Sequence, residues 1–370
     1  MRQTYGAVVV GTGFGLFVHV RALRAAGFDV RAIIGRDRAR TARRAAPLDI
    51  PLASDNLEQV LADDAGIRLV TVATPPHAHY DAVMTAIRAG RHVVCEKPFA
   101  RDADEARKML DAATEASVLH MMGAEFRFAS TQATIQRLVA GGAIGTPKHF
   151  IRIHLQDGLT DPEEPLAEWW TDASLGGGFL GAFGTHMIDQ ANLLMGDGQR
   201  VSAQLQHFAR GRPGMTADDG YTMQLDHGDG RQSLLIAGMA VPGGLVMETR
   251  VIGSDGAIWV KNGAQWGDPE EVWLRNGDGE RKVEIPADLA EPPPEPFPHE
   301  DLIQTEQDRW HTMGVDMPPY TRLFAEMRAR IDGNDPVLPE RAATFADAVV
   351  NQRTLDAARR AADRGSAEAI

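Results

Sequence analysis

The sequence contains one cysteine, Cys95, among 370 residues. A single cysteine forms no intrachain disulfide and no thiolate metal cluster, so a disulfide framework is excluded and we expect no metal. Long apolar runs are also missing, which excludes a predicted membrane-spanning helix. The first predicted strand lies within a few residues of Met1 and leaves no room for a signal peptide, so we expect a cytoplasmic protein.

Basic residues are in short supply: 38 lysines and arginines stand against 51 aspartates and glutamates, for a net charge of -13. This balance repels nucleic acids and anionic membranes, so we expect a small-molecule ligand and neither of those partners. Hydrophobic residues make up 44% of the chain and charged residues 24%, as in ordinary folded proteins. The length favours about two domains.

Residues 7 to about 120 alternate short β-rich runs with helical stretches rich in alanine and arginine. The runs predicted as strands are Ala7 to Val10, Val30 to Ile34, Leu69 to Ala73, His92 to Cys95 and Leu119 to Gly123. This rhythm is typical of an α/β fold with a doubly wound parallel sheet of the Rossmann type. We place this dinucleotide-binding domain at residues 1–122.

Beyond a predicted helix at Thr131 to Ala140, β-rich runs alternate with Gly, Asp and Asn turns. The runs are 148–155, 201–209, 221–226, 233–240, 244–253 and 257–261. They predict an α+β domain, residues 123–370, with a large open and mainly antiparallel sheet. The proline-rich segment 291–299 should be an extended connector, and two closing helices at 320–331 and 342–362 should pack back toward the first domain.

A glycine-rich turn, Gly11-Thr12-Gly13-Phe14-Gly15, follows the first strand and opens a helix. In that context backbone amides can approach a pyrophosphate, so these five residues are predicted to bind a dinucleotide. The strict spacing would put the last glycine at position 16, which is Leu16. The alternative is a tight turn with no ligand, which the preceding strand and following helix disfavour.

The second strand ends in Ile34-Gly35-Arg36, where an NAD site usually has an acidic residue for the ribose hydroxyls. Arg36 can pair with a 2′-phosphate, which tilts the prediction toward NADP, with NAD as the other cofactor. The alternative is that Arg36 and the arginines after it form a solvated helix face. The sequence leaves both readings open.

Two more strand ends should border the same crevice, because ligands of open α/β sheets bind at the carboxyl ends of the strands. One carries the predicted cofactor contacts Ala73, Thr74, Pro75 and His77, although Pro76 can also simply start the next helix. The other is Glu96-Lys97-Pro98, in which Glu96 and Lys97 are predicted to contact the cofactor and Lys97 is a candidate reactive group.

Five motifs occur in the order GTGFG with His19, ATPPHAH, CEKPFA, EFRF near 125 and GGGFLGAFGTHMID at 176–189. With the ending TFADAVVNQRTLDAARRAA, they resemble the Gfo/Idh/MocA oxidoreductase family over nearly the whole chain. The resemblance implies a Rossmann domain followed by a substrate-binding domain whose open sheet forms a homodimer or homotetramer interface. It also implies a nicotinamide cofactor and reversible oxidation of a hydroxyl on a sugar, cyclitol or related polyol.

By motif position, Lys97 matches the family's catalytic lysine and His186 its catalytic histidine. Hydride transfer leaves or consumes a proton on the substrate oxygen, so the site needs an acid/base within hydrogen-bond reach of that oxygen. Lys97 is the predicted main acid/base, with His186 assisting. The alternatives are a surface Lys97 paired with Glu96, which opposite-facing neighbours on a strand disfavour, and a core histidine bonded to backbone.

Candidate substrate contacts are Arg127, His154, Trp169, Trp170 and Asp189, the tryptophans as a stacking wall for a sugar ring. Arg127 and His154 could equally cap helix ends or face solvent, and one tryptophan could be core. The family commonly has an aspartate four residues before the histidine, where this chain has Ala182. Asp189, Glu168 or Asp172 could take its place.

Two other functions stay open. One is an NAD-dependent, non-redox enzyme of the same fold that cleaves glycosides. The other is a non-catalytic sensor that binds a dinucleotide, which Ala182 favours and the retained Lys97 opposes.

Overall fold

The computed structural model describes residues 4–163, 166–209, 211–263 and 267–370, apart from the side chains of residues 306 and 307. The chain divides into two compact units. Unit 1 comprises residues 1–128 and 291–349, and unit 2 comprises residues 129–290 and 350–370. The domain boundary predicted between residues 122 and 123 stays a prediction. The compact units are a separate division of the chain, in which residues 123–128 and 291–349 group with the first unit.

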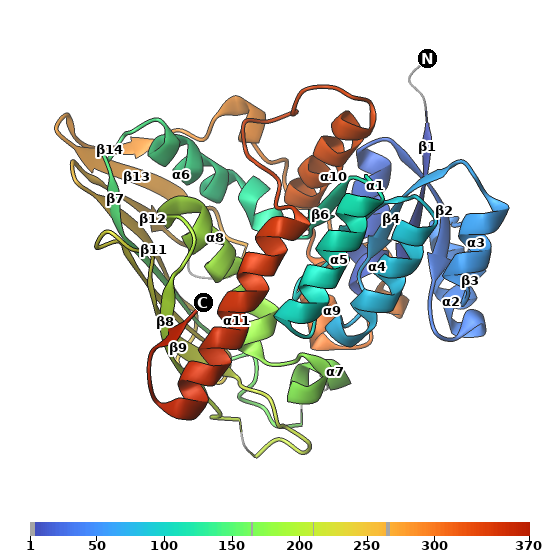
Figure 1. Ribbon diagram of the computed structural model, residues 1–370, viewed down its shortest axis with the longest axis horizontal. Helices are drawn as coiled ribbons and strands as arrows, with labels where there is room; N and C mark the ends of the chain where they lie inside the picture. The colour runs from blue at the N-terminus through green and yellow to red at the C-terminus, as the bar shows by residue number, and fades with distance from the viewer. Residues whose placement is uncertain (1–3, 164–165, 210, 264–266) are drawn as a thin grey trace. The chain divides into compact units, whose positions relative to one another are not determined.

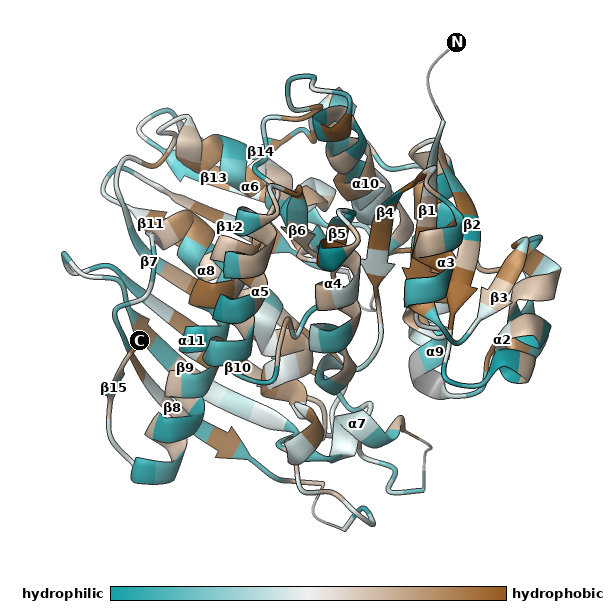
Figure 2. Cartoon of the chain, turned by 45° about the vertical axis from the view of Figure 1, so that its right-hand side comes forward, coloured by the Kyte–Doolittle hydropathy of each residue, from teal (hydrophilic) through white to brown (hydrophobic). Residues whose placement is uncertain are grey.

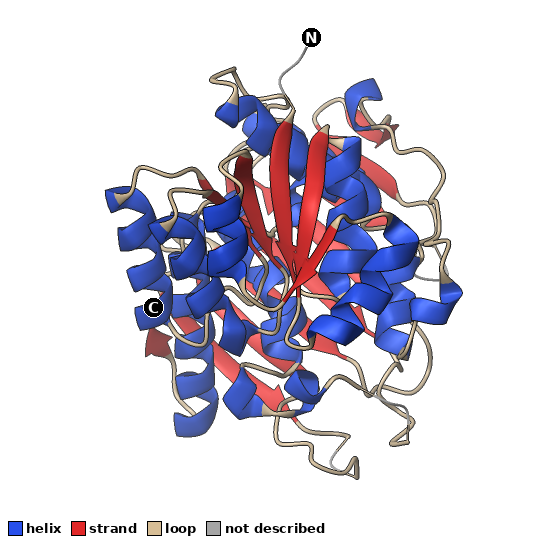
Figure 3. Ribbon diagram, turned by 90° about the vertical axis from the view of Figure 1, so that its right-hand side faces the viewer, coloured by secondary structure: helices blue, strands red, loops and turns tan. Residues whose placement is uncertain are grey.

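Unit 1 is built on a six-stranded parallel sheet in the order β3-β2-β1-β4-β5-β6 (Figures 1 and 3). This is the Rossmann strand order, so the predicted doubly wound sheet is confirmed. Its strands are β1 (Tyr5–Val10), β2 (Phe28–Ile34), β3 (Leu52–Ser54), β4 (Ile67–Val72), β5 (His92–Cys95) and β6 (His120–Met122).

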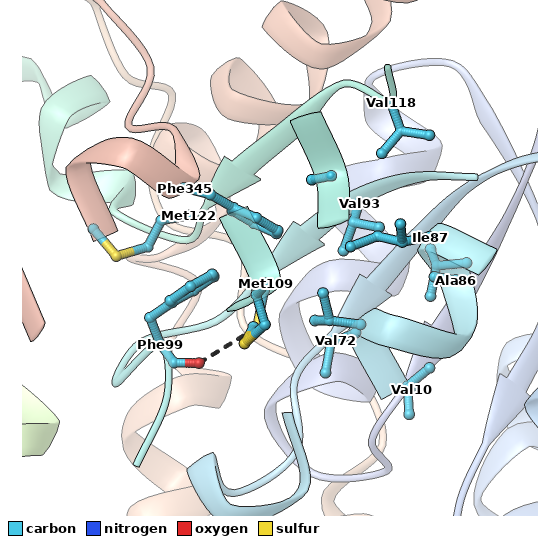
Figure 4. Close-up of a cluster of buried hydrophobic side chains, with 14 of the residues drawn as sticks. Val10, Val72, Ala86, Ile87, Val93, Phe99, Met109, Val118, Met122 and Phe345 are labelled. Carbon is cyan, nitrogen blue, oxygen red and sulfur yellow. Dashed lines mark hydrogen bonds between the residues drawn. The ribbon is translucent and has the colours of Figure 1, made fainter. Parts of the chain in front are cut away.

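Alternate side chains of these strands fill two separate cores, one on each face of the sheet. On one face Val10, Val72 and Val93 pack against α3 (Leu57–Asp63), α4 (His79–Arg88), α5 (Ala103–Glu115) and the start of α11 (Phe345–Arg364), as Figure 4 shows for part of this cluster. On the other face Val9 and Val94 pack against α1 (Val20–Ala25), α2 (Arg38–Ala45) and α10 (Met317–Ile331). Burial on both faces explains why the strands read as nearly continuous apolar runs, coloured as hydrophobic for β1 and β2 in Figure 2.

Unit 2 contains a nine-stranded sheet in the order β14-β13-β12-β11-β7-β10-β9-β8-β15. The β7 and β10 pair is parallel, whereas the other recorded pairs are antiparallel, which confirms the predicted mainly antiparallel sheet. The strands are β7 (Pro147–Leu155), β8 (Arg200–Gln206), β9 (Gly220–Asp226), β10 (Gln232–Gly238), β11 (Val246–Gly253), β12 (Ala257–Lys261), β13 (Glu271–Asn276), β14 (Gly279–Val283) and β15 (Glu368–Ala369).

Helices of unit 2 include α6 (Ser130–Ala140), α7 (Glu168–Thr171) and α8 (Thr185–Met195), and α8 packs on β7 and β10. Along β7, Phe150, Arg152 and His154 are buried, whereas Ile151 and Ile153 are only partly covered. The period of two shows that alternate residues of β7 face the covered side of the sheet.

Remaining described segments are irregular or short. Residues 291–298 contain no helix or strand, as the prolines predicted, and α9 (Glu306–Thr312) follows them. Within the described ranges, no helix combines the length and apolar character that crossing a bilayer requires.

Candidate functional site

Three strand ends meet side by side at the carboxyl edge of the parallel sheet. Val10 of β1 is in register with Val72 of β4, and Val72 is in register with Cys95 of β5. The backbone continues this alignment, because the Ala73 N–H donates to the Val10 carbonyl at 2.8 Å and the Glu96 N–H donates to the Val72 carbonyl at 2.8 Å. The glycine-rich turn, the Thr74 loop and Glu96-Lys97 therefore leave the sheet next to one another.

The glycine-rich turn is shaped by two different needs for glycine. Gly11 has a φ of +122°, and a Cβ there would lie 2.3 Å from the Ala73 carbonyl oxygen. Apart from Gly13 and its two chain neighbours, the described residues place no atom within 4 Å of the position that a Cβ at Gly13 would take. The first glycine lets two loops touch, and the second leaves open space at the start of the helix. Such space is what a pyrophosphate needs to reach backbone amides.

The helix after this turn begins with a π-helical turn, η1 (Gly15–His19), before α1. Gly15 lies against the sheet, since an added Cβ would come within 2.8 Å of the Val9 side chain. The Leu16 and Phe17 N–H groups donate to the Gly13 carbonyl at 2.9 and 3.1 Å. The wider π turn accommodates a glycine at position 15 with Leu16 buried where the strict motif has its last glycine.

The loop after β4 presents polar atoms that have no described partner. Thr74 Oγ1 and His77 Nδ1 are both buried, and neither has a hydrogen-bond partner among the described residues. His79, which the sequence reasoning missed, fixes this loop: its Nε2 lies 2.6 Å from the Thr74 carbonyl and its Nδ1 lies 3.1 Å from the Phe99 carbonyl. Orphaned polar atoms in the loop that leaves the sheet next to the glycine-rich turn fit a polar ligand such as a dinucleotide.

The arginines after β2 separate into two roles. Arg44 is buried, and its guanidinium donates to the Thr12 carbonyl at 2.9 Å and the Leu302 carbonyl at 3.0 Å. The hydrogen bond to Thr12 thus holds the backbone of the glycine-rich turn in place. Arg36 and Arg38 are exposed, and no ion pair is recorded for either among the described residues. Both readings of Arg36, phosphate contact and solvated face, therefore stay predictions.

Lys97 is half-buried, and Glu96 beside it points into the protein. The Glu96 carboxylate lies 3.0 Å from His19 Nε2 and accepts the Tyr320 hydroxyl at 2.5 Å. Its other oxygen accepts the Lys97 backbone N–H at 3.3 Å. Glu96 is only 4% exposed. The alternative of a surface Glu96–Lys97 pair does not describe this arrangement, because the carboxylate faces the core.

A second buried carboxyl, Glu125 in η4 (Glu125–Phe128), belongs to the same group. Burial raises the pKa of Glu125 well above its usual range, the charge of Lys97 lowers it, and the charge of Glu96 raises it. In the sequence, Glu125 is the first residue of the EFRF motif, and no local pattern marks it as a member of this group. Lys97 therefore has two buried carboxyl groups in its electrostatic surroundings.

His186 lies in the first turn of α8, buried at 3% exposure in unit 2. A π-helical turn, η6 (Leu180–Gly184), precedes α8 and contains Ala182. On an α-helix, residues four apart lie on one face, but the wider π turn changes that spacing between positions 182 and 186. Asp189 is also on α8 and is buried.

Asp218 holds the start of this helical run and was not predicted. Its carboxylate accepts the Leu180 N–H at 2.7 Å, and Gly178 gives it room, since a Cβ there would lie 2.1 Å from the carboxylate. Burial raises the pKa of Asp218 to about 6. The glycine run at 176–178 therefore accommodates a carboxylate from another segment, a contact that motif spacing does not reveal.

Three predicted substrate residues of unit 2 and the predicted catalytic histidine lie in one chain of ring contacts: His154, Trp169, Trp170 and His186. Trp169 and Trp170 have ring centroids 5.5 Å apart, Trp170 and Phe179 are 6.3 Å apart, and Phe179 stacks on Phe183 at 5.2 Å. Phe183 then contacts His154 at 4.4 Å and His186 at 6.3 Å. The structure thus brings four predicted residues together through Phe179 and Phe183, which the sequence reasoning had not singled out.

Two predicted substrate contacts have clear structural surroundings. Arg127 is 1% exposed and pairs with Asp347 at 3.2 Å in unit 1. His154 is buried beside Arg152 on β7, and burial and that charge lower its pKa to about 3. Both residues are buried, so neither faces solvent, and their roles toward a substrate stay predictions.

Comparison with known proteins identifies both halves of the chain. Residues 5–124 match a family model described as "Oxidoreductase family, NAD-binding Rossmann fold", and residues 132–259 match the GFO/IDH/MocA C-terminal domain. Levoglucosan dehydrogenase of Pseudarthrobacter phenanthrenivorans is 36% identical over 153 residues, 41% of this chain and 39% of that protein. D-xylose 1-dehydrogenase (NADP(+)) 2 of Haloferax volcanii is 32% identical over 198 residues, 53% of this chain and 58% of that protein. The matched stretches thus span less than two thirds of these relatives.

Solved structures share the fold over the whole chain. Levoglucosan dehydrogenase in complex with NADH and L-sorbose superposes with a TM-score of 0.82 at 23% identity, covering 100% of this chain and 99% of that one. An oxidoreductase domain protein from Kribbella flavida gives a TM-score of 0.81 at 24% identity, with 100% of both chains covered. At this identity the likeness shows the fold.

Proposed function

The chain belongs to the Gfo/Idh/MocA family of oxidoreductases, and from that premise we propose that it is an NAD(P)-dependent dehydrogenase or reductase. It interconverts a hydroxyl and a carbonyl on a sugar, cyclitol or related polyol, with Lys97 as the main acid/base. The observation that carries this proposal is the register of three strand ends, which places the glycine-rich turn, the Thr74 loop and Lys97 side by side.

The dinucleotide would be held by backbone and small side chains. Gly13 leaves the space for the pyrophosphate, and Thr74 Oγ1 and His77 Nδ1 offer polar atoms that lack a described partner. Ala73 and Pro75 of the same loop, and Thr12 and Phe14 of the glycine-rich turn, are the other proposed cofactor contacts. When bound, the nicotinamide supplies or accepts the hydride.

Lys97 accepts or donates the proton that accompanies hydride transfer. In the oxidation direction, the hydroxyl gives its proton to the Lys97 amine as the carbon-bound hydrogen leaves as hydride. In the reduction direction, the Lys97 ammonium donates that proton to the new alkoxide. Glu96 touches the Lys97 backbone rather than the substrate, so its part is to hold the lysine.

Substrate recognition is proposed for the aromatic residues of unit 2. Trp169 and Trp170 offer flat apolar faces of the kind that stack on sugar rings, and His154, His186 and Asp189 offer polar atoms. The names of two relatives, levoglucosan dehydrogenase and D-xylose 1-dehydrogenase (NADP(+)) 2, support the sugar class. His186 assists Lys97 or orients the reacting oxygen.

NADP is slightly favoured over NAD as the cofactor, because Arg36 stands two residues after the end of β2 and is exposed, without a recorded ion pair among the described residues. Arg44, by contrast, is committed to backbone carbonyls. We further propose a cytoplasmic homodimer or homotetramer, formed through the sheet of unit 2, where Leu234 and Val246 are exposed.

A substrate screen tests the proposal. Purified protein is incubated with NAD⁺ or NADP⁺ and a panel of sugars, inositols and other polyols, and with NADH or NADPH and the corresponding keto forms. Change in nicotinamide absorbance with at least one substrate is expected. Hydrolysis of an aryl glycoside with no net change in absorbance would instead support the glycoside-cleaving alternative. Dinucleotide binding without either reaction would support the sensor, which Ala182 favours.

A further inference from the structure

Arg152 is a buried arginine on β7 for which no ion pair is recorded among the described residues. It is 4% exposed, and its guanidinium donates one recorded hydrogen bond, from Nη1 to Thr249 Oγ1. Its Nε is also buried and has no hydrogen-bond partner in the described part of the chain. A buried charge is costly unless it is paired and hydrogen-bonded. The guanidinium therefore lacks the anionic partner that its position requires.

Two other buried arginines have such partners within the protein. Arg127 forms an ion pair with Asp347 at 3.2 Å. Arg44 donates to two backbone carbonyls. Burial of an arginine in this chain thus normally goes with acceptors for its guanidinium, and Arg152 departs from that rule.

The strand register accounts for the missing partner. Arg152 stands opposite Thr249 of β11 and opposite Leu235 of β10. Phe150 and His154 are the buried residues before and after it on the same side of β7. None of these four neighbours is acidic, and Thr249 supplies the one recorded acceptor.

Arg152 also lies next to residues that are proposed to bind the substrate. Two residues of a strand span about 6.7 Å, so His154 is within the length of the arginine side chain. The His154 ring contacts Phe183 at 4.4 Å between centroids, and Phe183 contacts His186 at 6.3 Å. A ligand that touches His154 can therefore be reached by the Arg152 guanidinium.

A second orphaned atom lies at the same end of the sheet. Asn262 Nδ2 donates to the Met247 carbonyl at 3.0 Å, and Met247 is in register with His154. Asn262 Oδ1 is buried and has no hydrogen-bond partner among the described residues. This oxygen can accept a ligand hydroxyl. The two orphaned groups together fit a ligand that carries both a hydroxyl and an anion.

The charges near Arg152 favour an anion with a single charge. Burial lowers the pKa of Arg152, and the charge of Glu270 raises it, with no ion pair recorded between the two side chains. His154 adds no positive charge near neutral pH, because burial and Arg152 lower its pKa to about 3. One guanidinium already under the influence of Glu270 matches a carboxylate better than a phosphate monoester, which carries a charge of about −2. The planar guanidinium also fits a carboxylate with two parallel hydrogen bonds.

We propose that Arg152 binds a carboxylate of the substrate, so that the substrate is a sugar acid, an aldonate or uronate, rather than a neutral sugar. This rests on the proposed function and names the class of its substrate. Arg152 is then a specificity-determining residue that takes no part in the transfer of hydride or proton. A neutral sugar is disfavoured because it leaves the buried guanidinium unpaired.

The test measures binding and needs no turnover. Isothermal titration calorimetry is carried out with NADPH or NADH present, since a reduced dinucleotide cannot oxidise the ligand. D-gluconate, D-glucuronate and D-galacturonate are compared with the neutral sugars D-glucose and D-galactose and with D-glucose 6-phosphate.

The test variant is Arg152→Met, which removes the guanidinium and keeps an unbranched apolar side chain. The matched control is Arg250→Met on the neighbouring strand β11. Arg250 follows Thr249 and therefore points to the other side of the sheet, where it pairs with Glu248 at 3.0 Å.

We expect at least one sugar acid to bind the wild-type protein at least about tenfold more tightly than its neutral counterpart. Arg152→Met should raise the Kd for that acid at least about tenfold, and Arg250→Met should leave it unchanged. Sugar acids that bind no more tightly than the neutral sugars would overturn the proposal, and so would an unchanged Kd in Arg152→Met. Tighter binding of the sugar phosphate than of every sugar acid would overturn the assignment to a carboxylate.

A second variant covers failure of the first to fold. If Arg152→Met is unfolded by circular dichroism, Arg152→Lys replaces it, because lysine keeps the charge and loses the two parallel hydrogen bonds. The Kd for the sugar acid must again rise, and an unchanged Kd overturns the proposal.

Failure of this proposal and failure of the proposed function give different results. A sugar acid that binds through Arg152 but causes no change in nicotinamide absorbance with NAD⁺ or NADP⁺ would sink the proposed function and leave the carboxylate site standing. Redox turnover of neutral sugars, with no binding of sugar acids, would leave the proposed function standing and overturn the role of Arg152.

Discussion

Two glycines of the same turn should respond to alanine in opposite ways. Gly11 has a φ of +122°, and its added Cβ would lie 2.3 Å from the Ala73 carbonyl oxygen and 2.7 Å from the carbonyl carbon. Both obstacles are backbone atoms, so relief requires movement of two loops at the carboxyl edge of the sheet. We expect Gly11→Ala to destabilise the protein by roughly 3 kcal/mol, from strain at a positive φ and from overpacking.

Beyond its two chain neighbours, Gly13 has no atom of the described part of the chain within 4 Å of an added Cβ, so Gly13→Ala fits the folded chain. It should leave stability unchanged or raise it by about 0.4 to 1 kcal/mol, because alanine narrows the unfolded ensemble. The methyl would instead occupy the space proposed for the pyrophosphate. We therefore expect NADPH and NADH to bind at least about tenfold more weakly, which corresponds to about 1.4 kcal/mol.

Urea unfolding and fluorescence titration with NADH and NADPH measure the two quantities on the same samples. The expected pattern is a stability loss for Gly11→Ala and an affinity loss without stability loss for Gly13→Ala. Gly13→Ala that binds both dinucleotides as tightly as the wild-type protein would refute the assignment of this turn as the pyrophosphate site. Gly11→Ala with wild-type stability would refute the reasoning from its contacts.

Three further outcomes follow from single side chains. Arg36→Ala should raise the Kd for NADPH about tenfold and the Kd for NADH less than about twofold. Arg38→Ala, on the same exposed segment, is the control. Equal losses of affinity for both dinucleotides would contradict a contact between Arg36 and the 2′-phosphate. Burial raises the pKa of Asp218 to about 6 in the folded protein, above the ordinary value of about 3.9. The contribution of Asp218 to the free energy of unfolding is therefore complete below about pH 4. It is lost, by on the order of 3 kcal/mol, as the pH rises through about 6. Asp218→Asn should flatten this part of the stability profile in urea unfolding, and an unchanged slope would be contrary to the assignment. NMR of the His154 ring should show a neutral imidazole above about pH 4, because burial and Arg152 lower its pKa to about 3; a titration near pH 6.5, the ordinary value, would show that it is solvated.

Periodicity predicted the elements that bury the most side chains. β1, β4 and β5 are buried at nearly every position, so their sequences are mostly apolar and their positions were clear, although Arg68 of β4 is exposed. β3 is three residues long and partly exposed, and β14 is mostly exposed, so neither leaves an apolar pattern. The π-helical turns at 15–19 and 180–184 were also missed, because propensity does not distinguish a π turn from the α-helix that follows it.

The candidate site was predictable where it depends on strand ends, and not where it depends on distant contacts. Lys97 and the glycine-rich turn follow strands directly, so the Rossmann topology brings them together. Glu96 turns inward because His19 and Tyr320 meet it from 77 and 224 residues away. Asp218 meets the 176–180 segment in the same way, from 38 residues beyond Leu180. No local pattern encodes such pairs.

The most direct test of the account is Lys97→Met, measured for both turnover and dinucleotide binding on the substrate that the screen identifies. Methionine keeps the length of the side chain and removes the proton-carrying amine. Lys108→Met, on the exposed side of α5, is the control. We expect Lys97→Met to lower kcat by a factor on the order of 1,000 with dinucleotide affinity nearly unchanged, and Lys108→Met to match the wild-type enzyme. Wild-type turnover in Lys97→Met would contradict the central claim.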